Sequence, residues 1–162
     1  MLYNFEKTLL VILLTITFSC KNYNNENHYK NFAIVTAKYE ATKAGHKILK
    51  MGGNAFDAMI ATDLALSVVY PNAGNLGGGG FMVYRTSNSQ YGSIDYREKA
   101  PLLSSENMYL DKNGNIIKNL SREGSLSIGV PGTVAGLFEV YEKFGTLPLD
   151  SIFKPALELA RD

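Results

Sequence analysis

The sequence predicts an incomplete α+β domain, and three neighbouring features carry this prediction. Residues 55–69 have the length of a helix and are apolar or small on almost every side. Residues 81–96 contain two short runs of strand-forming residues, and residues 73–80 include five glycines. A helix that is apolar all round must be buried on more than one side, so we expect it to pack between layers, against a sheet.

The composition fits one ordinary domain or part of a larger one. The chain has 162 residues, of which 46% are hydrophobic and 19% are charged, and its formal net charge is +1. There is no basic excess of the kind that indicates nucleic-acid binding. Cys20 is the only cysteine, which excludes an internal disulfide.

Residues 1–20 have the pattern of a secretion signal. Residues 8–18 are mostly apolar, too few to span a bilayer, which takes about 20 residues, but typical of a signal-peptide core. Cys20 follows this run behind a small residue, an arrangement that resembles a bacterial lipoprotein signal. A plain cleaved signal and an uncleaved anchor are the alternatives. The lipoprotein interpretation predicts lipidation at Cys20 and a membrane-anchored protein, periplasmic or at the cell surface.

A polar tether and a first strand and helix should follow. Residues 21–31 are polar and rich in asparagine, which is typical of a tether. We expect the domain to cover residues 32–162 and to begin with a buried strand at residues 32–37. A helix over residues 40–51 should come next, closed by a pair of glycines. Its apolar positions recur at helical spacing: Ala41, Ala44, Ile48 and Met51.

The apolar helix over residues 55–69 has recognisable start and stop signals. Asn54 is a favoured N-cap residue, and Asp57 stands three residues later, where it complements the helix dipole. Asp63 is the only later charge in this helix. Pro71 ends it.

The glycines of residues 73–80 favour a structural function over phosphate binding. A P-loop needs Lys and then Ser or Thr after its last glycine, but Gly80 is followed by Phe81. A dinucleotide site needs a strand before the glycines and a helix after them, and here the order is reversed. The glycines therefore serve either a turn with positive φ or the close approach of another backbone or a ligand, and we favour a structural turn over direct ligand contact.

The remaining elements are a hairpin, an irregular segment and two helices. Strands are expected at residues 81–85 and 93–96, joined by a long turn. Turn signals fill residues 101–123. A helix should start at Pro131 and Gly132 and end at Phe144, and another should run from about residue 151 to 161 with Pro155 near its start. The hairpin has no further strand to pair with, so the domain looks incomplete.

Few side chains offer chemistry. His28 and His46 belong to neither an HExxH motif nor a Cys/His cluster, so no metal site or cofactor is predicted. A Gly-x-Ser-x-Gly elbow is missing. Arg97 is the exception, because it follows the second strand of the hairpin and its planar fork of donors matches a carboxylate. An ion pair of Arg97 with Asp95 or Glu98 is the alternative.

Four motifs in order carry a family resemblance: Ile48–Ala58, Pro71–Phe81, Asp95–Pro101 and Pro131–Gly136. Together they resemble the start of the large subunit of γ-glutamyltranspeptidases, also called glutathione hydrolases. The resemblance extends over residues 33–162. It implies part of an N-terminal-nucleophile (Ntn) hydrolase fold, an αββα sandwich of two sheets covered by helices.

The resemblance also implies an activity. In the family, a proenzyme cleaves itself to expose a threonine, which attacks a γ-glutamyl amide such as that of glutathione and forms an acyl-enzyme. The arginine of the matching motif binds the α-carboxylate of the glutamyl group, and this function falls to Arg97. The nucleophile lies further along the family's chains, so we expect no catalytic residue in this chain and a small subunit as its partner. Thr133 and Thr146 have no reason to become N-terminal.

Two kinds of alternative stay open. A cephalosporin acylase or a poly-γ-glutamate processing enzyme would share much of this fold. From a different class, the chain would be a catalytically inactive, truncated lipoprotein fragment or a binding module.

Overall fold

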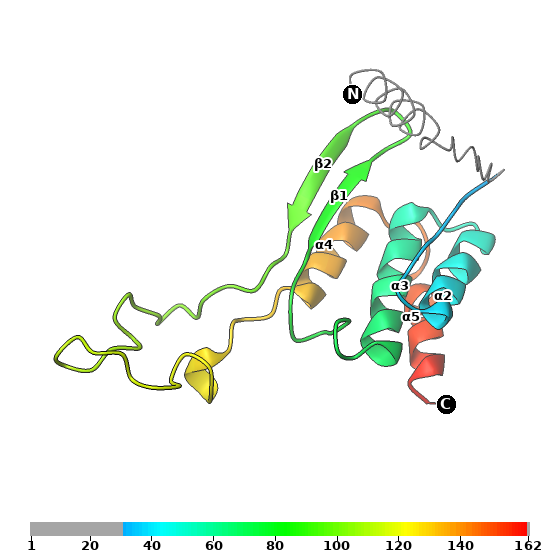
Figure 1. Cartoon of the computed structure of the whole chain (residues 1–162). Helices are drawn as coiled ribbons and strands as arrows, with labels where there is room; N and C mark the ends of the chain where they lie inside the picture. The colour runs from blue at the N-terminus through cyan, green and yellow to red at the C-terminus, as the bar shows by residue number, and fades with distance from the viewer. Residues whose placement is uncertain (1–30, 162) are drawn as a thin grey trace, which may run out of the picture. The chain divides into compact units, whose positions relative to one another are not determined.

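The computed structural model describes residues 31–161 (Figure 1). The predicted signal, the tether up to residue 30 and Cys20 lie outside the described residues. Residues 31–33 belong with the preceding unit, so the fold described below begins at Ile34.

Four helices form what we call the helical layer. They are α2 (Tyr39–Lys50), α3 (Ala55–Val69), α4 (Thr133–Phe144) and α5 (Leu149–Leu159). Helix α3 packs against the other three. Every residue of α3 after Ala55 is buried or half-buried, which confirms the prediction of a helix covered on several sides.

The junction between α2 and α3 confirms the predicted caps. Gly52 has a φ of +90°, the left-handed conformation that glycine adopts without strain. The Asn54 side chain accepts hydrogen bonds from the N–H groups of Phe56 and Asp57, and the Asp57 carboxylate accepts one from the Asn54 N–H, which completes a capping box. Met51 was expected on the buried face, but it follows the last helical turn and is half-exposed.

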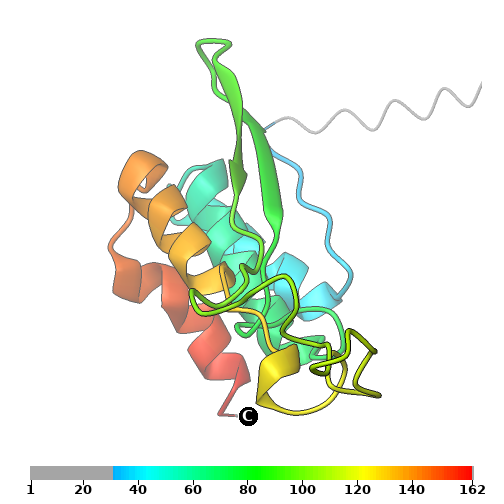
Figure 2. The ribbon, with the colours of Figure 1, turned by 90° about the vertical axis from the view of Figure 1, so that its left-hand side faces the viewer.

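The two strands form an antiparallel hairpin, β1 (Phe81–Arg85) and β2 (Tyr91–Asp95). Strand β2 begins two residues earlier than predicted, because Gly92 pairs opposite Tyr84 and leaves room for its ring. The turn between the strands is therefore shorter than predicted. It is closed by a 2.7 Å hydrogen bond from the Thr86 N–H to the Gln90 carbonyl. It projects beyond the helices in both views (Figure 1, Figure 2).

One face of the hairpin joins the core of the helical layer. Met82 and Ile94 are buried there, and a trio of rings ties the hairpin to α3 and α4. Phe56 stacks on Phe144 with ring centroids 4.2 Å apart, and the Tyr84 ring lies 4.9 Å from Phe144. The other face is exposed through Phe81, Val83 and Tyr91. The described residues therefore form a partial α+β fold, as predicted.

Two predicted elements were wrong in detail. Residues 34–37 are not a strand, since no described strand lies beside them to complete their backbone hydrogen bonds, and Val35 is 91% exposed. Helix α5 starts at Leu149, behind Pro148, so Pro155 lies inside the helix rather than near its start. Pro155 is nevertheless buried.

Residues 97–130 form a long segment that we call the arm. Its regular structure among the described residues is one 3₁₀ turn, Ser125–Ser127, and two isolated bridges, which confirms the predicted irregular stretch. Leu102 and Leu103 are almost completely exposed. In residues 31–161 we find no helix of the length and hydropathy that a bilayer crossing requires.

Candidate functional site

The site is built where the glycine-rich segment meets the end of the hairpin. The Tyr96 N–H donates to the Gly80 carbonyl at 3.0 Å, which extends the hairpin ladder past its last paired residues. A Cβ on Gly79 would lie 2.6 Å from the Tyr96 carbonyl oxygen and 2.7 Å from the Arg97 Cα. No glycine from 74 to 80 has a positive φ. Of the two predicted reasons for these glycines, close backbone approach is therefore correct and the positive-φ turn is wrong.

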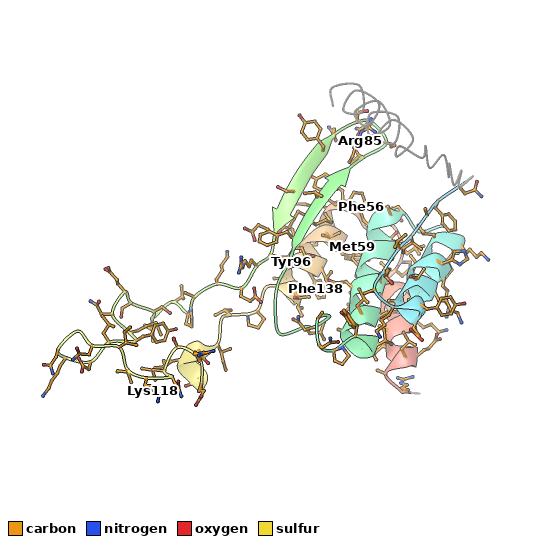
Figure 3. The ribbon with its side chains drawn as sticks, viewed as in Figure 1. Phe56, Met59, Arg85, Tyr96, Lys118 and Phe138 are labelled. Atoms are coloured by element: carbon orange, nitrogen blue, oxygen red, sulfur yellow. The ribbon has the colours of Figure 1, made fainter. Side chains whose placement is uncertain are left out.

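The start of α4 packs against the same part of the glycine-rich segment. The Gly78 carbonyl accepts hydrogen bonds from the N–H groups of Gly132 and Thr133, at 2.8 and 3.0 Å, and so caps the helix. A Cβ on Gly132 would collide with the Tyr96 carbonyl, and one on Gly136 with the Tyr96 ring. Figure 3 shows Tyr96 between the end of the hairpin and α4. Three of the four sequence motifs thus meet around one tyrosine.

Burial and a nearby acid act on that tyrosine. Burial first, and then the negative charge of Asp63 on α3, raise the pKa of the Tyr96 hydroxyl. Burial likewise raises the pKa of the Asp63 carboxyl. Tyr96 therefore stays neutral well above physiological pH, as a ring that packs against the core.

Arg97 follows this fixed tyrosine, and its side chain is 70% exposed. Its backbone N–H donates to the Asp95 carboxylate at 3.0 Å. The guanidinium has two neighbours among residues 31–161: the Glu98 carboxylate, 4.0 Å from Nε, and the Phe81 ring, whose centroid is 5.9 Å away. The distance between Arg97 and Glu98 is thus at the upper limit for an ion pair. The guanidinium fork stays open for another carboxylate.

Arg97 lines two hollows that meet at this residue. The smaller, about 210 Å³, lies between the end of β2 and the start of α4. The larger, about 570 Å³, is lined by both ends of the arm. A fixed backbone with an open cation at the rim of two hollows can bind a small carboxylate ligand.

The first motif serves a different purpose, which the sequence did not reveal. Asp57 is completely buried and accepts hydrogen bonds from the N–H and the hydroxyl of Thr146, 89 residues later, as well as from the Asn54 N–H. The Asn54 amide also donates to the Phe144 carbonyl at 2.6 Å. The motif therefore joins the start of α3 to the end of α4. The visible signal, an aspartate at a helix start, pointed only to a cap.

The other candidate residues among those described, His46 and Thr133, line neither of the two hollows beside Arg97. His46 is half-buried in α2, and Thr133 is buried at the start of α4. No cluster of His, Cys, Asp and Glu in residues 31–161 has the arrangement of a metal site. Cys20, the predicted lipidation site, lies outside the described residues.

Comparison with known proteins places this geometry in a family. The Gamma-glutamyltranspeptidase family profile matches residues 41–162. A "Glutathione hydrolase proenzyme" of Pseudomonas sp. (strain A14) is 45% identical over 161 residues, which cover 96% of this chain and 28% of that protein. The chain thus spans little more than a quarter of that relative's length.

Solved structures agree. The crystal structure of Helicobacter pylori gamma-glutamyltranspeptidase superposes with a TM-score of 0.77 at 46% identity, covering 82% of this chain and 38% of that one. A cephalosporin acylase from Bacillus halodurans superposes with a TM-score of 0.67 at 27% identity, covering 85% of this chain and 27% of that one. The chain belongs to the γ-glutamyltranspeptidase family.

Proposed function

We propose that this chain is the N-terminal part of the large subunit of an enzyme that transfers or hydrolyses γ-glutamyl groups. Its substrates would be glutathione and related γ-glutamyl peptides. Membership of the family and 45% identity to a glutathione hydrolase proenzyme support this proposal. The structural observation that carries it is the open guanidinium of Arg97, which lines two hollows. The backbone of Arg97 is held there by its close contact with Gly79.

In this proposal Arg97 binds the α-carboxylate of the γ-glutamyl group. Two parallel N–H···O bonds from a guanidinium fix both the position and the orientation of a carboxylate. Such a contact holds the far end of the glutamyl group, so the γ-carbonyl can be aligned with a nucleophile. The weak contact with Glu98 costs little to break, because both side chains are substantially exposed.

The reaction itself requires residues that this chain does not supply. The nucleophile would be an N-terminal threonine of a small subunit, which forms an acyl-enzyme and passes the γ-glutamyl group to water or an amino acid. The small subunit is therefore the partner that completes the site.

The test uses the protein expressed from its complete reading frame. Arg97→Lys should lower kcat/KM for glutathione by about a hundredfold or more, because lysine cannot form the bidentate contact. Self-cleavage into two subunits should proceed as in the unmodified protein. Arg85→Lys, at the opposite end of the hairpin (Figure 3), is the matched control.

Three outcomes would contradict the proposal in different ways. Unchanged kinetics for Arg97→Lys would remove Arg97 from the substrate site. A protein that cleaves acylated cephalosporins but no γ-glutamyl compound would be an acylase of the same fold. A reading frame without a small subunit would favour the inactive lipoprotein fragment or binding module.

We also propose that Cys20 carries a lipid that anchors the protein to a bacterial membrane, with the enzyme periplasmic or at the cell surface. The apolar run before Cys20 and the small residue next to it support this. Cys20→Ser should move the protein from the membrane fraction to the soluble fraction. Retention in the membrane fraction would contradict lipid anchoring at this residue.

A further inference from the structure

The larger hollow beside Arg97 contains a second cation. Lys99 lines both hollows together with Arg97. Its backbone is fixed by two hydrogen bonds with Val130, of 3.1 and 2.7 Å, which join the two ends of the arm. Within residues 31–161 the Lys99 ammonium has no ion-pair or hydrogen-bond partner. The backbone of Lys99 is thus held in place two residues after Arg97, and its ammonium is left open.

A hydroxyl group in the same hollow also lacks a partner. The Ser104 hydroxyl oxygen is shielded from solvent and makes no hydrogen bond to any described residue. Ser104 lines the larger hollow with Arg97 and Lys99. A shielded polar atom without a partner is uncommon and calls for a ligand or another partner.

The charge balance of the larger hollow favours an anion. Its lining includes two cations, Arg97 and Lys99, and one carboxylate, Glu98. Its volume of about 570 Å³ lies within the range of small-molecule sites, about 300–1,000 Å³. One cation is already assigned to the α-carboxylate in the proposed function. The second cation and the hydroxyl remain for another anionic group of the same molecule.

We propose that Lys99 and Ser104 bind a second carboxylate of the substrate, the one carried by the leaving group. The inference rests on the proposed function and narrows its substrate class. The preferred donors are γ-glutamyl peptides with a free C-terminal carboxylate, in preference to γ-glutamyl amides whose leaving group is uncharged. Lys99 donates as an ammonium and Ser104 as a hydroxyl, so both recognise a carboxylate oxygen.

The test compares two donors in the protein from the complete reading frame. Glutathione has a carboxylate in its leaving group, and a γ-glutamyl anilide has none. Lys99→Gln should lower the ratio of kcat/KM for glutathione to that for the anilide by about tenfold. Ser104→Ala should lower this ratio in the same direction, by about threefold. Lys99→Arg should keep most of it.

Lys118→Gln provides the matched control, because Lys118 lies on the arm (Figure 3) but lines neither hollow. Its ratio should equal that of the unmodified protein. If Lys99→Gln leaves the ratio unchanged while the unmodified protein cleaves both donors, binding of the leaving-group carboxylate by Lys99 and Ser104 is refuted and the proposed function stands. If the unmodified protein cleaves neither donor, the proposed function fails and the subsite fails with it.

Discussion

The helical layer and the arm each contain an aspartate that accepts three hydrogen bonds, and the two carboxylates differ in how far along the sequence their donors lie. Asp57 is buried, and two of its three donors belong to Thr146, 89 residues away. Asp111 is exposed, and its donors belong to Asn113 and Asn115, within four residues. One carboxylate joins two helices, and the other only shapes a turn.

The same contrast holds for apolar side chains. Ile48 and Ile152 in the helical layer are completely buried, whereas Leu102 and Leu103 in the arm are almost completely exposed. Contacts within the chain therefore determine the helical layer, while the arm depends on local turns and on the two bridging hydrogen bonds between Lys99 and Val130. Arg97 begins the arm, with its backbone close to Gly79 and its guanidinium near the Glu98 carboxylate and the Phe81 ring.

The largest effect should come from removing the buried carboxylate. Asp57→Ala leaves the Asn54 N–H and two donors of Thr146 without their acceptor, so the free energy of unfolding should fall by about 3 kcal/mol. Urea unfolding followed by circular dichroism measures this change. Asp111→Ala is the matched variant in the arm and should leave the midpoint of urea unfolding almost unchanged. Equal losses in the two variants would contradict the contrast between the regions.

A smaller effect should follow from filling the space beside Arg97. A Cβ at Gly79 meets backbone atoms that cannot rotate away, so Gly79→Ala should cost about 1–3 kcal/mol of stability and weaken binding through Arg97. Gly77, two residues earlier, has nothing within 4 Å of its added Cβ. Gly77→Ala should therefore be neutral or slightly stabilising. Thermal unfolding of the pair measures the difference, and an equally tolerated Gly79→Ala would exclude the proposed close packing.

The smallest effect concerns acid pH. Burial raises the pKa of Asp63 above 3.8, so the folded chain binds this proton more tightly than the unfolded chain does. The charged form therefore destabilises the fold at neutral pH, and acidification relieves the cost. Asp63→Asn should raise the unfolding midpoint at neutral pH, with a gain that shrinks as the pH falls through the raised pKa towards 3.8. A gain independent of pH would show that the charge is not the cause.

Acidification should have the opposite effect at Asp111, where it removes a stabilising contribution. The Asn115 N–H above all lowers the pKa of the Asp111 carboxyl below 3.8. The turn is therefore favoured above this pH and should loosen as the pH falls through the lowered pKa. Amide chemical shifts of Asn113 and Asn115 during an acid titration measure this response. Shifts that stay constant down to full protonation would contradict the proposed hydrogen bonds.

The contrast between the regions also explains what the sequence could predict. Helical periodicity, the Asn54 cap and Gly52 identified α2 and α3, because those signals lie within a few residues of one another. Motif order identified the family and placed Arg97 after the hairpin. The link from Asp57 to Thr146 and the contact of Gly79 with Tyr96 could not be predicted, because each joins residues far apart in the sequence. Residues 34–37 were misassigned because a strand also depends on a neighbour that the pattern does not contain.

The central claim is that Arg97 binds the α-carboxylate of a γ-glutamyl group, and a substrate-variant cycle tests it most directly. Two donors that differ only in this carboxylate, a γ-glutamyl anilide and the corresponding 4-aminobutanoyl anilide, are compared in the unmodified protein and in Arg97→Lys. Removing the carboxylate should lower kcat/KM by about a hundredfold or more in the unmodified protein and far less in the variant. An equal loss in both proteins would show that another residue holds the carboxylate.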